Sequence, residues 1–125
     1  MKTIYFILLS VLFVATGQLM LKQGLIDLGE LHFGKEDLSE TASKVFTSPL
    51  VLFGITLFAL SSVLWLTALS RAELSFAYPL LSIGYATVAV ASFVLFNETL
   101  SITRIIGIVV ILIGISILSL NGGQK

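Results

Sequence analysis

Four long runs of apolar residues dominate the chain and leave few polar positions between them. The runs cover residues 3–21, 49–69, 74–96 and 105–120. Each is close to the ~20 residues that a helix needs to cross the hydrocarbon core of a bilayer, and none alternates between apolar and polar positions as a strand would. Because only helices and closed barrels satisfy the backbone inside lipid, the pattern predicts an all-α membrane protein with four transmembrane helices.

Turn and capping residues separate these runs. Ser48 precedes Pro49, which places an N-cap hydroxyl before a proline at the first helical position. The charged segment 71–73 precedes the third run, and Pro79 lies near enough to its start to be tolerated there or to kink the helix. Arg104 introduces the fourth run. We therefore expect residues 1–125 to form a single four-helix transmembrane domain.

The polar loop of residues 22–48 is the only long segment between two runs. Its second half has the pattern of an amphipathic helix with one apolar face, and Glu40 and Lys44 are spaced for an ion pair one turn apart. We expect this helix to lie along the membrane surface. His32, in the first half of the loop, is interpreted as a polar residue of the interface rather than as a metal ligand.

Composition strengthens the membrane assignment and narrows the chemistry. Of the 125 residues, 57% are hydrophobic and only 11% are charged, against roughly 25% charged residues in soluble proteins. The first run is longer than the ~7–15 apolar residues of a secretory signal peptide, so we expect it to be retained. The chain lacks cysteine, and no pattern of residues indicates a catalytic set, a metal site or a cofactor. An enzyme is not expected.

Lysine and arginine are divided almost evenly between the two sides of the predicted membrane domain. One side carries Lys2, Arg71 and Lys125, and the other carries Lys22, Lys35, Lys44 and Arg104. The positive-inside rule therefore gives almost no bias. We expect a cytoplasmic amino terminus, and insertion in both orientations stays open. Because the four runs contain no charged residue, they lack the intramembrane carboxylate that proton-driven carriers commonly use.

The third run has a polar face. It consists of residues at helical spacing, namely Ser75, Tyr78, Ser82, Tyr85 and Ser92. These side chains could bond to other helices, or they could line a groove for the head group of a substrate. Gln18, with Ser10 two turns earlier in the first run, could form the opposite wall. Trp65 is interpreted as an interfacial anchor rather than a platform for substrate.

The fourth run carries Gly107 and Gly114 seven residues apart, and therefore on one helical face. Small residues allow helix backbones to approach closely in lipid. The two glycines could serve packing within the chain, but we favour a dimerisation face, because the rest of this run is almost uniformly isoleucine, valine and leucine.

Several segments resemble the EamA-like branch of the drug/metabolite transporter superfamily. They are 77–85 (AYPLLSIGY), 95–101 (LFNETLS) and 104–114 (RIIGIVVILIG). Residues 16–23 (TGQLMLKQ) look like the small subunits of the aminoarabinose-phosphoundecaprenol flippase. The resemblance covers all four predicted helices.

The small multidrug resistance exporters are related more distantly. They share the glycine pair at Gly107 and Gly114 and the tyrosine at Tyr78. Their proton-exchanging glutamate, however, falls on Val14 in this chain, and their substrate-stacking tryptophan falls on Leu81. Proton-coupled drug export by their mechanism is therefore not expected of this chain alone, although a partner subunit could supply the missing carboxylate.

The resemblance implies a flippase subunit of the bacterial inner membrane that moves a lipid-linked sugar of the undecaprenyl-phosphate type. It would act as a homodimer, or as a heterodimer with a similar small subunit. The residues expected to bind substrate are Gln18, Lys22, Arg71, Tyr78, Ser82, Tyr85, Glu98 and Arg104. The cations would bind the phosphate, although each could simply extend to the interface. Glu98 would pair with Arg104 or gate the outer opening. A small drug or metabolite exporter and an accessory subunit remain alternatives.

Overall fold

The computed structural model describes residues 2–29 and 38–120 of the chain, and these residues form five helices. In chain order they are α1 (Lys2–Leu28), α2 (Leu38–Thr47), α3 (Pro49–Leu69), α4 (Leu74–Phe96) and α5 (Ile102–Ser119). Helices α1, α3, α4 and α5 are each long and apolar enough to cross a membrane. The prediction of an all-α, multi-pass membrane protein with a short helix between its first two spans is confirmed.

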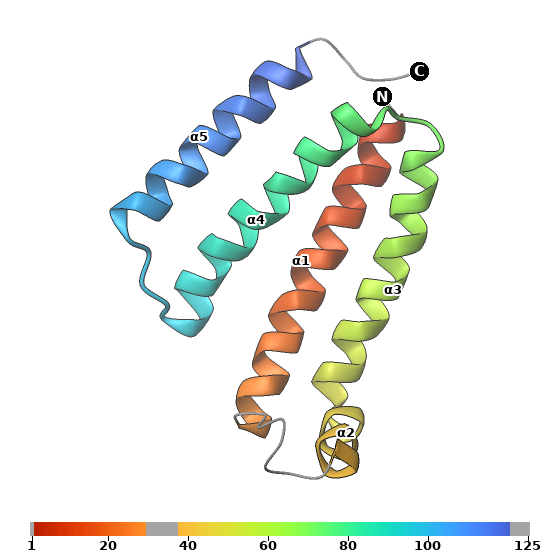
Figure 1. The fold of residues 1–125 in the computed structure, drawn as a ribbon, viewed down its shortest axis with the longest axis vertical. Helices are drawn as coiled ribbons and strands as arrows, with labels where there is room; N and C mark the ends of the chain where they lie inside the picture. Colours follow the sequence, from red (N-terminus) through yellow and green to blue (C-terminus); the bar gives the residue numbers. More distant parts are fainter. Residues whose placement is uncertain (1, 30–37, 121–125) are drawn as a thin grey trace.

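The four long helices lie side by side in a single layer, in the spatial order α5, α4, α1, α3 (Figure 1). Helix α1 is central, because it packs along α3 on one side and against α4 on the other. Helix α5 contacts only α4 among the described helices. The short α2 lies at the end of the layer where α1 finishes and α3 begins.

Helices α3 and α4 have the predicted bounds. Ser48 is the N-cap of α3 and Pro49 its first residue, although the Ser48 hydroxyl makes no capping hydrogen bond. Helix α4 continues through Pro79 from Leu74 to Phe96. It ends at Asn97, whose φ of 52° is the left-handed conformation that often terminates a helix.

Two helices extend beyond the apolar runs predicted as spans, α1 at its carboxyl end and α5 at its amino end. Helix α1 continues past Lys22 to Leu28, because a lysine side chain can reach the interface without interrupting the helix. It stops before Gly29, which has a φ of +83° that favours glycine. Helix α5 begins at Ile102, since the Ser101 side chain accepts a hydrogen bond from the Arg104 amide at 3.3 Å and so caps it.

A seam of small residues joins α1 to α3. Ser10 and Ser61 are buried, and each hydroxyl donates to the other residue's carbonyl, at 3.0 and 3.1 Å. Two turns further along α1, Gly17 lies against Gly54 of α3. A Cβ added to Gly17 would lie 3.0 Å from the Gly54 carbonyl oxygen, and a Cβ added to Gly54 would lie 2.8 Å from the Gly17 carbonyl oxygen. The backbones of the two helices therefore touch, which is how transmembrane helices gain packing energy without a hydrophobic driving force.

The short helix of the polar loop is also present. The Lys44 ammonium lies 3.4 Å from a carboxylate oxygen of Glu40, as the spacing predicts. Thr41 is buried, and α2 packs against α3 and α1. The position of α2 on the membrane surface stays a prediction, and His32 lies outside the described residues.

Candidate functional site

A cavity of about 280 Å³ lies between three of the long helices. Its floor is α1, and its walls are α3 and α4, which make few contacts with each other. The cavity exists because α1 holds these two helices apart. Its lining comprises Ser10, Val11, Val14, Ala15 and Gln18 from α1, Phe58, Ser61, Ser62 and Trp65 from α3, and Leu81, Gly84, Tyr85 and Val88 from α4.

Several polar groups of the residues that line this cavity make no hydrogen bond within the described part of the chain, and the Trp65 indole N–H is one of them. The Gln18 carboxamide and the Tyr85 hydroxyl make no hydrogen bond there, whereas the Ser10 and Ser61 hydroxyls bond to each other's helices. Gln18 and Ser10 line the same cavity as Tyr85, from α1, and their role as a wall of a substrate groove stays a prediction. Because a polar group in an apolar environment gains from a hydrogen-bond partner, Gln18 and Tyr85 are the groups best placed to bind a polar ligand.

A second cavity, also of about 280 Å³, continues toward the amino end of α5. Tyr85 and Val88 line both cavities, and the second adds Ala89, Ser92, Glu98, Thr99, Leu100 and Arg104. We call the two cavities together the α4 groove. The polar positions Tyr85, Ser92 and Arg104 mark its course. None of the five polar residues predicted on the face of α4 bonds through its side chain to another described helix, which argues against the interpretation that they serve interhelical bonding within the chain.

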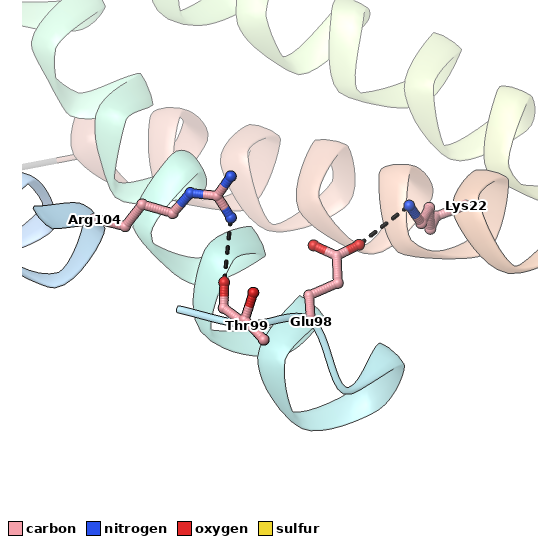
Figure 2. A network of polar contacts seen from close by, with 4 residues as sticks. All are labelled: Lys22, Glu98, Thr99 and Arg104. Carbon is pink, nitrogen blue, oxygen red and sulfur yellow. Dashed lines mark hydrogen bonds and ion pairs between the residues drawn. The ribbon is translucent and has the colours of Figure 1, made fainter. Parts of the chain in front are cut away.

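Charged residues converge at the Arg104 end of the α4 groove (Figure 2). The Lys22 ammonium lies 3.1 Å from a carboxylate oxygen of Glu98. The Arg104 guanidinium donates to the Thr99 carbonyl oxygen at 3.3 Å. The suggested pairing of Glu98 with Arg104 is therefore wrong, because α1 extends far enough to bring Lys22 to the loop that follows α4. Lys2 and Lys22 are separated by about 30 Å of helix, close to the thickness of the hydrocarbon core.

Other predicted site residues lie elsewhere. Arg71 is at the opposite end of the layer, with its guanidinium carbon 5.4 Å from the centre of the Phe6 ring. Tyr78 packs edge-on against Trp65, with ring centres 5.6 Å apart. Ser82 is half-buried and lines neither cavity. The structure therefore gathers Gln18, Lys22, Tyr85, Glu98 and Arg104 along one groove and leaves Arg71, Tyr78 and Ser82 outside it.

Trp65 lies in the wall of the first cavity rather than at an outward-facing position. It is half-buried and packs against the core. The interpretation as an interfacial anchor stays a prediction. Sequence reasoning also missed Ser61 and Ser62, although two adjacent serines in an otherwise apolar run are a signal for a polar contact or a polar lining.

Two positions singled out by the family comparison face the same cavity. Val14 and Leu81, which stand where the multidrug exporters have their glutamate and tryptophan, both line it. At these two positions the cavity of this chain therefore has an aliphatic lining. A cation entering it would meet no carboxylate from these positions.

The two glycines of α5 do not serve packing within the described part of the chain. A Cβ added to Gly107 or Gly114 would have no atom within 4 Å, and nearly all of α5 is exposed. The interpretation that they pack inside the monomer is wrong. A dimerisation face stays a prediction.

Comparisons with known proteins agree with this architecture. The sequence profile of the EamA-like transporter family matches residues 31–120. The chain is 37% identical to the probable 4-amino-4-deoxy-L-arabinose-phosphoundecaprenol flippase subunit ArnF of Proteus mirabilis over 124 residues, which is 95% of this chain and 93% of that protein. Proteins of the same name from Photorhabdus laumondii and Shewanella sediminis are 35% and 38% identical, covering 90% and 86% of this chain and 92% and 81% of theirs. No solved structure gives a significant match. The chain is thus a member of the EamA-like transporter family.

Proposed function

We propose that this chain is one subunit of a flippase that moves an amino sugar linked to undecaprenyl phosphate across a bacterial inner membrane. The names of the relatives suggest this substrate. The observation that carries the proposal is the α4 groove, which leads to Arg104 and in which Gln18 and Tyr85 have no hydrogen-bond partner among residues 2–29 and 38–120.

The groove suits a substrate with a polar head and a long apolar tail. The head group would travel along Gln18, Tyr85 and Ser92, while the polyprenyl tail stays in lipid beside α3 and α4. A polar head group costs several kcal/mol to bury in hydrocarbon without partners, so a path with a few hydrogen-bonding side chains lowers the barrier. The mostly aliphatic remainder of the lining would not stabilise an inorganic ion.

Native mass spectrometry tests this proposal directly. The protein would be extracted gently from its own membrane and examined for bound lipid. We expect an assembly that carries a polyprenyl-phosphate mass with an amino-sugar increment. An assembly that carries no such lipid and binds added lipophilic cations would instead support a small drug exporter and contradict the proposal.

We also propose that α5 joins this chain to a second subunit, either an identical copy or a similar small protein. A single layer of helices covers its groove from one side only, and α5 has an apolar surface that contacts nothing but α4 among the described helices. A second subunit packed against Gly107 and Gly114 would bury that surface. The relatives are named as subunits, which is consistent with such an assembly.

Replacing both Gly107 and Gly114 with leucine is expected to break the dimer without unfolding the chain. Each new side chain would project into space that is open within the monomer but occupied by the partner. The distribution between monomer and dimer would be measured in bilayers by single-molecule photobleaching. Ser116→Leu, at an exposed position on the opposite side of α5, is the matched control. An unchanged dimer in the double variant would exclude this face as the interface.

A further inference from the structure

We propose that the Arg104 end of the α4 groove recognises a head group that carries one negative and one positive charge. Arg104 would bind the anionic group, and Glu98 would bind an ammonium group. Lys22 would hold Glu98 in the empty state, and the ammonium of the ligand would take its place. This inference rests on the proposed function and specifies which part of the substrate each residue recognises.

The first support is the position of Glu98. Its side chain lines the second cavity, and one carboxylate oxygen pairs with Lys22 at 3.1 Å. The other carboxylate oxygen has no partner in the described part of the chain. The side chains of Glu98 and Lys22 are 40% and 50% exposed, so their pairing is the solvent-screened kind that contributes little stability. An arriving ammonium group can therefore replace Lys22 at little cost.

The second support is the state of Arg104. Its guanidinium lines the same cavity and makes a single hydrogen bond, to the Thr99 carbonyl oxygen. No carboxylate lies within ion-pair distance of it among the described residues. The remaining N–H groups form the planar fork that fits phosphate oxygens in a bidentate arrangement. Figure 2 shows Arg104 and Lys22 on either side of Glu98.

Opposite charges lining one cavity select against ligands with a single charge. A phosphate without an amine would bind Arg104 but face the Glu98 carboxylate, and a simple cation would bind Glu98 but face the Arg104 guanidinium. A ligand with both groups satisfies both residues at once. Such juxtaposition produces specificity by repelling the wrong partner as well as attracting the right one. An amino sugar on a phosphate has this pattern of charge.

The test compares two probes that differ only in the amine. One is farnesyl phosphate esterified with 4-amino-4-deoxyarabinose, and the other carries arabinose with a hydroxyl at that position. Binding to the full chain in nanodiscs would be measured by calorimetry. We expect the amino probe to bind about fivefold more tightly, as is typical of a half-exposed ion pair. Glu98→Gln should abolish this preference, and Arg104→Gln should weaken the binding of both probes.

Two further variants separate recognition from a structural role. Lys22→Gln should strengthen binding of the amino probe, because it removes the competitor for Glu98. If the ion pair were purely structural, its removal would weaken the binding of both probes. Glu73→Gln changes an exposed acid at the other end of α4 and should keep the preference. Equal binding of the two probes to the wild type, or a preference that survives Glu98→Gln, would overturn this inference and leave the flippase proposal standing. Failure of both probes to bind would overturn both.

Discussion

Replacing Gly54 with leucine is expected to destabilise the protein more than any substitution on α5. Its Cβ would lie 2.8 Å from the Gly17 carbonyl oxygen, a backbone atom that cannot move without separating α1 from α3. Overpacking of this kind typically costs about 1–3 kcal/mol, and we expect the upper end because the seam also holds the hydrogen bonds between Ser10 and Ser61. Thermal unfolding in detergent, followed by circular dichroism, would measure the loss.

Ala59→Leu is the matched control for this substitution. Ala59 is on the same helix but exposed, and surface changes usually alter stability by less than about 0.5 kcal/mol. We expect its melting temperature to equal that of the wild type. If Gly54→Leu had the same melting temperature as Ala59→Leu, the close approach of α1 and α3 would not be the principal contact of the fold.

Replacing Tyr85 with alanine is expected to lower the transport rate about tenfold or more while leaving the fold intact. Tyr85 lines both cavities, and its hydroxyl, which has no hydrogen-bond partner in the described part of the chain, can bond to a passing head group. Loss of a hydrogen bond to a charged group costs roughly 1.5–3 kcal/mol, which corresponds to at least about tenfold. Transport would be followed in proteoliposomes that contain the amino-sugar lipid, with a membrane-impermeant amine reagent that labels only the outer leaflet.

Tyr5→Ala provides the control for this measurement. Tyr5 is 68% exposed, almost as Tyr85 is at 67%, but it lines neither of the two described cavities. We expect its transport rate and its stability to match the wild type. A wild-type rate in Tyr85→Ala would mean that the head group does not travel along the α4 groove.

The bounds of the helices could be predicted where a residue stops the helix for a local reason. Pro49 begins α3, as its place after Ser48 predicts. The end of α1 was misplaced because Lys22 was taken as the limit of the helix, although a helix is interrupted by backbone conformation rather than by charge. Gly29 and Ser101 were the available signals for the end of α1 and the start of α5.

The pairing of the helices could not be predicted in the same way. Uniformly apolar helices carry almost no directional pattern, so hydropathy does not say which face meets which neighbour. Gly17, Gly54 and Ser61 form the seam only because α1 and α3 are antiparallel and in one register, which depends on the whole chain. The same limitation hid the ion pair of Lys22 with Glu98, since the partners are distant in sequence.

Only part of the candidate site could be predicted from the sequence, because the contacts between helices do not follow from spacing within one helix. Helical spacing indicated that Tyr85 and Ser92 share a face, and the structure adds Gln18 and Arg104 to their groove. Spacing within α4 could not show that Tyr78 packs edge-on against Trp65, or that Ser82 lines neither of the two cavities. Arg71 was included for its charge alone, and it lies at the opposite end of the layer.

The central claim is that this chain provides a path for an amino-sugar lipid phosphate across the bilayer. Labelling of proteoliposomes with the impermeant amine reagent tests it most directly, on the assembly extracted gently from its own membrane. We expect labelling to proceed beyond the outer-leaflet fraction toward completion, without added ATP, whereas labelling of protein-free vesicles stops at the outer-leaflet fraction. Labelling that stops at the same level with and without the protein would contradict it.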